Sequence, residues 1–146
     1  MIEESKSAIV ILACNTLSSL IFHYNLRFKK TVVDVITPTI YFLRKRNYQN
    51  ITILATKNTK FMDVYSKLLS CNINYIDATD LIEEIETGNV NEITIKNIIE
   101  VIPKSSELLV LGCTHLIKIK DIIKELSPIE ILSQDEVFID FLNENI

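Results

Sequence analysis

The stretch 108–116, Leu-Leu-Val-Leu-Gly-Cys-Thr-His-Leu, joins an apolar run to a turn and then to a segment of helical period. Residues 9–17, Ile-Val-Ile-Leu-Ala-Cys-Asn-Thr-Leu, repeat that order, and the two cysteines are 113 − 14 = 99 positions apart. A short apolar run without polar alternation is typical of a strand that is buried on both faces of a parallel sheet. The two stretches therefore predict two similar strand-to-helix corners, each with one thiol.

The rest of the chain alternates such runs with helical segments, which is the pattern of a parallel α/β sheet. Strands are predicted at 8–13, 31–36, 51–55, 73–76, 108–112 and 129–132, and helices at 16–28, 38–46, 58–70, 79–87, 91–102, 115–126 and 134–143. Ligands of open parallel sheets bind at the carboxyl ends of the strands. We therefore expect the functional residues at the corners that follow these strands.

Composition excludes several classes of partner. The 146 residues are 48% hydrophobic with a formal charge of −4, which suits a globular domain and offers no basic surface for nucleic acid. The apolar runs are far shorter than the roughly 18 to 20 residues that a membrane helix needs. The acidic opening, residues 1–6, lacks the order of a secretory signal. We expect a cytoplasmic protein that binds neither nucleic acid nor membrane.

The cysteines Cys14, Cys71 and Cys113 are an odd and scattered set, which favours reduced thiols over a disulfide framework. Cys14 and Cys113 each follow a predicted strand and precede a predicted helix, where backbone N–H groups favour the thiolate. The alternative for each is a small buried apolar side chain, and we assign that role to Cys71. The repeated corner makes Cys14 and Cys113 candidate bases or nucleophiles.

Other cysteine chemistries fit the sequence less well. A tyrosine-phosphatase loop needs an arginine where this chain has Leu20 or Ile119. A metal site is the strongest alternative, since Cys14, Cys113 and His115 would supply three ligands, but no fourth ligand stands out. With only two glycines, neither a dinucleotide-binding turn nor a Walker loop can be written. We expect neither a metal nor a nucleotide cofactor.

Four short motifs resemble the cofactor-independent glutamate and aspartate racemases. Ala13-Cys14-Asn15-Thr16 and Gly112-Cys113-Thr114-His115 match the two cysteine motifs of the glutamate branch, whereas aspartate racemases usually carry glutamate where His115 stands. Asp34-Val35-Ile36-Thr37-Pro38 resembles the family's Val-Ile-x-Pro, and Ala55-Thr56-Lys57-Asn58-Thr59 resembles its Gly-Thr-x-x-Thr loop. The resemblance implies an isomerase that converts L-glutamate to D-glutamate for peptidoglycan and cell-wall synthesis.

The resemblance also implies roles for individual residues. Cys14 would exchange a proton on one face of the substrate α-carbon and Cys113 on the other, so that no pyridoxal cofactor is needed. His115 would assist Cys113, and Glu83 falls where the family has an acidic partner for its histidine, although the register equally allows Glu84. The substrate's carboxylates and ammonium would be held by Asn15, Thr16, Thr56, Thr59 and Thr114.

The same resemblance divides the chain into one near-complete α/β domain, 37–127, and a remnant of a partner domain, 1–36 and 128–146. The Asp-Ser-Gly and Pro-Tyr-Gly segments that precede the first cysteine in the family are missing from the sequence, so we expect an amino-terminally shortened racemase. Its possible partners are the amino-acid substrate and further copies of the chain. The alternatives are a catalytically inactive fragment or interaction module, and an aspartate or hydantoin racemase.

Overall fold

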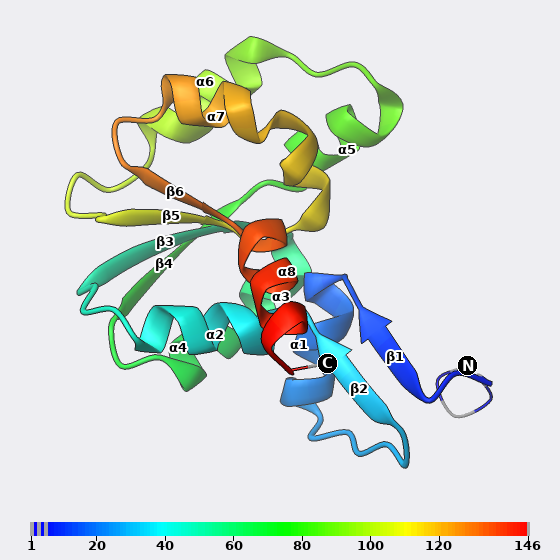
Figure 1. The fold of residues 1–146 in the computed structure, drawn as a ribbon. Coiled ribbons are helices and arrows are strands. Elements are labelled where there is room, and N and C mark those ends of the chain that lie inside the picture. The colour runs from blue at the N-terminus through cyan, green and yellow to red at the C-terminus, as the bar shows by residue number, and fades with distance from the viewer. Residues whose placement is uncertain (1, 3, 5, 146) are drawn as a thin grey trace.

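The computed structural model describes residues 2, 4 and 6–145 and has an α/β fold with parallel strands (Figure 1). Each predicted strand is present in the described chain, with both ends within two residues of the prediction. The strands are β1 (Ile9–Leu12), β2 (Thr31–Asp34), β3 (Asn50–Ala55), β4 (Asn72–Asp77), β5 (Leu108–Leu111) and β6 (Glu130–Ser133). The prediction of a parallel α/β sandwich is confirmed.

The described strands form two separate sheets rather than one. β1 and β2 make a two-stranded sheet, while the other strands form a four-stranded sheet in the order β4-β3-β5-β6. In the four-stranded sheet Ile53 of β3 lies opposite Val110 of β5, and Leu111 of β5 lies opposite Ser133 of β6. The sequence grouped 128–146 with 1–36, but β6 pairs with β5, because its apolar run completes the buried edge of the larger sheet. The division into domains stays a prediction.

The helices occupy most of the predicted positions. They are α1 (Asn15–His23), α2 (Ile36–Arg44), α3 (Lys57–Met62), α4 (Val64–Leu68), α5 (Thr79–Thr87), α6 (Glu92–Glu100), the 3₁₀-helix η1 (Thr114–Ile119), α7 (Lys120–Leu126) and α8 (Gln134–Asn145).

Three of the predicted helices differ in the structure. The helix predicted at 58–70 is broken at Asp63, whose φ of 49° is left-handed, a conformation that aspartate tolerates better than most residues. The helix predicted at 16–28 stops at His23, and Asn25 follows with the same left-handed φ. The segment predicted as helix from 115 begins as the 3₁₀-helix η1 instead of α-helix.

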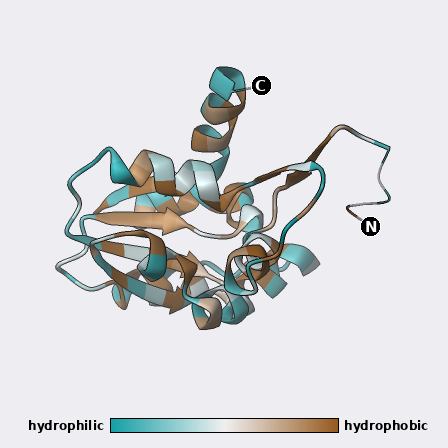
Figure 2. Cartoon of the chain, turned by 90° about the horizontal axis from the view of Figure 1, so that it is seen from below, coloured by the Kyte–Doolittle hydropathy of each residue, from teal (hydrophilic) through white to brown (hydrophobic). Residues whose placement is uncertain are grey.

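The four-stranded sheet separates two apolar clusters. Along β3 and β5 the side chains alternate, so that Ile53 and Val110 join one cluster while Leu54 and Leu109 join the other. Helices α2, α4 and α8 cover the first face and α5, α6 and α7 the second (Figures 1 and 2). Each fully buried side chain of this size contributes about 1.5–3 kcal/mol relative to exposure, so this sheet is the stable body of the molecule.

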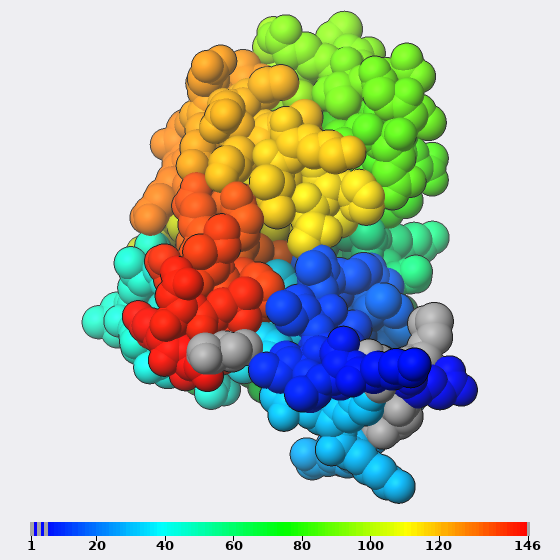
Figure 3. Space-filling model, turned by 45° about the vertical axis from the view of Figure 1, so that its right-hand side comes forward, coloured from blue at the N-terminus to red at the C-terminus, as the bar shows by residue number. Residues whose placement is uncertain are grey.

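The two-stranded sheet is much less covered. Ile9 is 37% exposed and Ile11 is 50% exposed, and both line a hollow together with Leu142 of α8. Figure 3 shows the first strand at the surface beside the carboxyl-terminal helix. Within the described part of the chain, no helix has the length and apolar character needed to cross a membrane.

Candidate active site

The two cysteine corners predicted from the sequence have the same local geometry. Cys14 follows β1 and stands immediately before α1, while Cys113 follows β5 and stands immediately before η1. Both have extended backbone angles, with φ and ψ of −117° and 119° for Cys14 and −150° and 133° for Cys113. The similarity of the two corners is therefore confirmed.

The environment of Cys113 opposes ionisation of its thiol. Cys113 is only 8% exposed, and this burial raises the pKa of its thiol above the ordinary value. The backbone N–H groups of His115 and Leu116 lower the pKa, as expected at a helix start, but electrostatic interaction with Cys14 and Glu86 raises it further. The sequence expectation of a favoured thiolate is thus wrong for Cys113, because loss of solvent outweighs the N–H groups.

The imidazole of His115 connects Cys113 to an acidic residue. Its Nδ1 lies 3.7 Å from the Sγ of Cys113, and its Nε2 lies 3.3 Å from Oε1 of Glu86. The sequence selected Glu83, or Glu84 as the equal alternative, for this position, and the structure corrects it. Glu86 is one helical turn after the buried Ile82 on α5, which brings it to the side of the helix next to η1.

Glu83 and Glu84 have other surroundings. Glu83 is exposed, and its backbone carbonyl accepts a hydrogen bond from the hydroxyl of Thr87 at 2.9 Å. The Glu84 carboxylate accepts a hydrogen bond from the Asn91 N–H at 2.8 Å and another from the Thr94 hydroxyl at 2.7 Å. These bonds to the start of α6 lower the pKa of Glu84. The Glu84 carboxylate therefore holds the junction between α5 and α6 together.

Three of the predicted substrate-binding threonines meet at one point. The hydroxyl oxygen of Thr16 lies 3.0 Å from that of Thr56 and 3.3 Å from that of Thr59, and the last two are 3.1 Å apart. Thr56 also accepts the backbone N–H of Thr59 at 3.2 Å, which caps α3. Thr114 is the first residue of η1 and half-buried. The hydroxyls of Thr56 and Thr59, which follow β3, therefore lie against the hydroxyl of Thr16, which follows β1.

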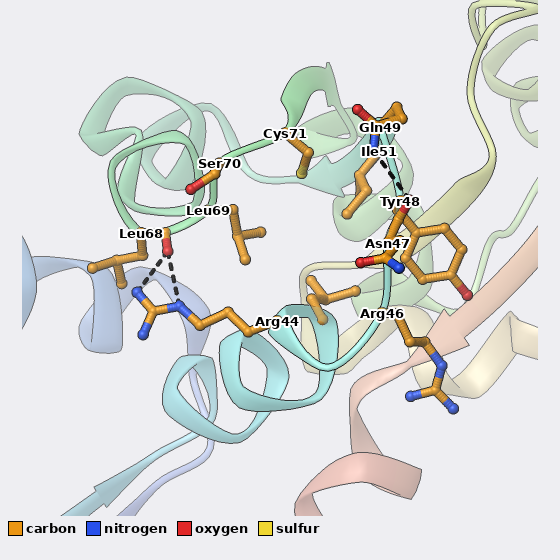
Figure 4. Close-up of a pocket in the computed structure, with 11 residues that line it drawn as sticks. Arg44, Arg46, Asn47, Tyr48, Gln49, Ile51, Leu68, Leu69, Ser70 and Cys71 are labelled. Atoms are coloured by element: carbon orange, nitrogen blue, oxygen red, sulfur yellow. Dashed lines mark hydrogen bonds between the residues drawn. The ribbon is translucent and has the colours of Figure 1, made fainter.

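Two hollows lie at opposite ends of the strands. Thr16 contributes to one of about 280 Å³ between α1 and α3, with His23 and Phe61. A larger one of about 430 Å³ lies at the amino ends of β3 and β4, where Arg44 and Cys71 line it (Figure 4). None of the predicted site residues lines the larger hollow. The carboxyl ends of the strands remain the candidate active site.

No group of three histidine, cysteine, aspartate or glutamate residues in the described chain is arranged to hold a metal ion. The sequence-based alternative of Cys14, Cys113 and His115 as ligands therefore has no geometric support from the described residues. That the protein needs no metal stays a prediction.

No family model matches the sequence. A glutamate racemase of Fusobacterium nucleatum is 31% identical over 141 positions, covering 88% of this chain and 53% of that protein. The chain is similar to glutamate racemases over most of its own length. It spans about half the length of the curated racemases that it matches.

Solved structures support the fold of this chain. The glutamate racemase of Thermus thermophilus in complex with β-chloro-D-alanine has a TM-score of 0.79 and 22% identity, over 95% of this chain and 56% of that one. The glutamate racemase of Francisella tularensis in complex with D-glutamate has a TM-score of 0.77 and 22% identity, over 96% of this chain and 59% of that one. The fold described above is thus the racemase fold.

One part of the candidate site was not predicted from the sequence. The Asn15 side chain is 2% exposed, and it forms hydrogen bonds with Tyr65 and Gln134. The sequence marked Asn15 as substrate-binding and gave no role to Tyr65 or Gln134. In the sequence Gln134 lies in the polar run Ser133-Gln134-Asp135-Glu136, which does not reveal its partners. These bonds tie the Asn15 side chain to α4 and α8, and its role in substrate binding stays a prediction.

Proposed function

We propose that this chain carries the two-thiol site of a cofactor-independent glutamate racemase, which interconverts L- and D-glutamate. The observation that carries the proposal is the pair of alike thiol corners, with Cys14 immediately before α1 and Cys113 immediately before η1, and with the second thiol 3.7 Å from His115. The similarity to glutamate racemases supports glutamate as the substrate class, and the bound D-glutamate of the Francisella tularensis protein supports an amino-acid ligand.

In the proposed reaction one sulfur takes the α-proton while the other sulfur supplies a proton to the opposite face. The C–H bond breaks, its electron pair is delocalised into the neighbouring carboxylate, and a new C–H bond forms from the second S–H. Nothing is oxidised or reduced, so no redox cofactor is required. Because burial raises the pKa of Cys113, this residue is held as a thiol at neutral pH and is ready to donate.

The surrounding polar groups have complementary proposed roles. The hydroxyls of Thr16, Thr56 and Thr59 form a cluster of donors for a substrate carboxylate, where charge grows as the α-proton leaves. Thr114 directly follows Cys113 and is proposed to hold the other end of the substrate. Glu86 would orient His115, which in turn accepts or returns the proton of Cys113.

We further propose that the product D-glutamate serves peptidoglycan synthesis in the cytoplasm. This step follows from the proposed reaction and from the glutamate racemase relatives. A strain that depends on added D-glutamate tests it: expression of the chain should remove the dependence, and expression of the Cys113→Ser variant should not. Growth with both forms would contradict the proposal.

The direct test is turnover of L-glutamate in D₂O, followed by circular dichroism and by loss of the α-proton signal in NMR spectra. Cys14→Ser and Cys113→Ser should each abolish racemisation, because each face needs its own acid or base. Cys71→Ser is the matched control, since Cys71 lies at the opposite end of the sheet, and it should keep wild-type rates. Dialysis against a chelator should change nothing.

Three outcomes of this test count against the proposal. Racemisation that survives in both serine variants would contradict the two-thiol mechanism. Loss of turnover on chelation with recovery by zinc would favour the metal site instead. A folded wild-type chain that neither racemises glutamate nor exchanges its α-proton would favour the catalytically inactive alternative.

A further inference from the structure

Four buried polar side chains from four different helices meet beside the Cys14 corner. Asn15 comes from α1, Thr39 from α2, Tyr65 from α4 and Gln134 from α8, and each is at most 2% exposed. Buried polar groups are costly unless they are hydrogen-bonded. Such a group is therefore a fixed part of the structure, and its bonds show which elements it holds together.

The bonds run from α1 to the helices of the larger body. The Tyr65 hydroxyl donates to Oδ1 of Asn15 at 2.8 Å. Nε2 of Gln134 donates to the Tyr65 hydroxyl at 2.8 Å and to Oγ1 of Thr39 at 2.9 Å. Nδ2 of Asn15 donates to Oε1 of Gln134. Gln134 thus bonds to each of the other three side chains.

Gln134 is itself tied to the four-stranded sheet. It is the first residue of α8 and directly follows Ser133 of β6, which pairs with β5. The next residue, Asp135, accepts a hydrogen bond from Nζ of Lys120 at 2.9 Å, which joins the start of α8 to α7. Cys113 lies at the end of β5. The network therefore connects the residue after Cys14 to the sheet that carries Cys113.

No described strand of the two-stranded sheet pairs with a strand of the four-stranded sheet. The relative placement of the two cysteine corners consequently depends on side-chain contacts. Apolar packing is non-directional, whereas hydrogen bonds in a dry interior have demanding geometry. Asn15 is the neighbour of Cys14 in the chain, so whatever fixes Asn15 also fixes the Cys14 backbone.

We propose that Gln134 and Tyr65 are positioning residues for Cys14, which hold its corner at the correct place relative to Cys113 through the buried Asn15 side chain. The catalytic consequence rests on the proposed racemase function, but the structural part does not. Neither residue touches the reacting atoms. Their effect is to set the separation and orientation of the two sulfurs, to which proton transfer is sensitive at the level of one ångström.

The pH dependence of Cys113 alkylation reports the separation of the two thiols. The groups that act on Cys113 are Cys14 from α1, Glu86 from α5, and the backbone N–H groups of His115 and Leu116 in η1. A nearby Cys14 thiolate raises the Cys113 pKa. If the Cys14 corner moves away, that contribution is lost and the midpoint of Cys113 alkylation shifts to lower pH.

The test variant is Tyr65→Phe, which removes only the hydroxyl, and Gln134→Met is the second variant in case one of them fails to fold. Iodoacetamide labelling of each cysteine is followed by mass spectrometry across pH. We expect the Cys113 midpoint to fall by roughly 0.3 to 1 pH unit, the size of a charge–charge interaction at this range. In a Cys14→Ser background the same substitution should produce no further shift.

Thr52→Val is the matched control. Thr52 and Ser106 form another buried hydroxyl pair in the same body, 2.7 Å apart, so the substitution also breaks a buried hydrogen bond. It should lower stability without moving the Cys113 midpoint. An equal shift in Thr52→Val, or a full shift of Tyr65→Phe that persists without Cys14, would overturn the positioning role, because either result means general loosening around Cys113.

Kinetics supply the catalytic readout. Tyr65→Phe should lower kcat for glutamate about tenfold or more with a smaller change in KM, since Thr56, Thr59 and Thr114 belong to the body that carries Cys113 and only Thr16 moves with the Cys14 corner. A tenfold rise in KM with unchanged kcat would contradict the proposal. A wild-type chain without racemase activity would remove the proposed function, while the alkylation measurements would still decide whether Gln134 and Tyr65 position Cys14.

Discussion

Oε1 of Glu86 lies 3.3 Å from Nε2 of His115, and the other nitrogen of that imidazole lies 3.7 Å from the thiol of Cys113. The imidazole thus contacts both the carboxylate and the thiol, with Glu86 on α5, His115 in η1 and Cys113 immediately before η1. The side chains of His115 and Glu86 are 41% and 53% exposed. Solvent and salt therefore weaken their attraction, and its main effect is orientation of the imidazole.

The first prediction concerns Glu86→Gln. The negative charge of Glu86 raises the pKa of Cys113, so its removal should lower that pKa and speed alkylation of Cys113 near pH 8. Racemisation should slow by about 10- to 100-fold, by analogy with the loss of the carboxylates that orient metal-ligating histidines. Rates of labelling and of turnover measure the two effects.

Glu83→Gln is the control for Glu86→Gln, because Glu83 is exposed on the same helix while the carboxylate that contacts His115 belongs to Glu86. It should leave both the labelling of Cys113 and turnover unchanged. Equal effects of the two substitutions would mean that the net charge of α5, and not the position of Glu86, is responsible.

The second prediction is that Gly112→Ala strains the Cys113 corner. A Cβ on Gly112 would lie 2.8 Å from Cγ2 of Ile53 and 3.2 Å from the carbonyl oxygen of Leu54. Overpacking of this kind costs about 1–3 kcal/mol, and the adjustment should change the alkylation rate of Cys113. Urea unfolding measures the loss of stability, and iodoacetamide labelling measures the alkylation rate of Cys113.

Gly88→Ala is the control for Gly112→Ala. A side chain at the Gly88 φ of +75° costs stability, but its Cβ would meet open space, so Cys113 labelling should not change.

The third prediction is loss of stability at alkaline pH. Burial raises the pKa values of Tyr65 and Tyr75 above the ordinary value of 10.0. The unfolded chain therefore loses these protons first, so the stability from the neutral hydroxyls is complete below about pH 10 and declines as pH rises further. Each group adds a slope of about 1.4 kcal/mol per pH unit.

Tyr75→Phe should remove one such slope from the free energy of unfolding, measured in urea at a series of alkaline pH values. Ile40→Val, in the same apolar cluster, should cost about 0.5–1.5 kcal/mol at every pH and leave the slope intact. A Tyr75→Phe slope equal to that of the unsubstituted chain would show that another group controls alkaline unfolding.

The fourth prediction concerns self-association. β1 pairs with β2 alone among the described strands, and Ile11 is 50% exposed on it. An unpaired apolar edge favours pairing with another chain, and a lysine opposes it. Ile11→Lys should therefore weaken association at least about tenfold, as measured by sedimentation velocity.

Val101→Lys is the control for Ile11→Lys. Val101 is 63% exposed at the end of α6, away from β1, so its substitution should leave association unchanged. A wild-type chain that stays monomeric at high concentration would rule this out.

The sequence by itself determined the elements and the chemistry-bearing corners. Strand positions follow from short apolar runs, which are local features, and the repeated strand-cysteine-turn pattern placed Cys14 and Cys113 correctly at strand ends. The convergence of Thr16 with Thr56 also followed, because the carboxyl ends of parallel strands face one side. These properties depend on neighbours in the chain, so they can be read from it.

Only the tertiary structure decided which groups act on those corners. The choice of Glu86 over Glu83 depends on the rotation of α5 about its axis, and the raised pKa of Cys113 depends on how completely surrounding segments exclude water. The partners of Asn15 lie 50 and 119 positions away in the chain. Rotation, desolvation and distant hydrogen bonds are set by packing of the whole chain, and no local pattern of residues encodes them.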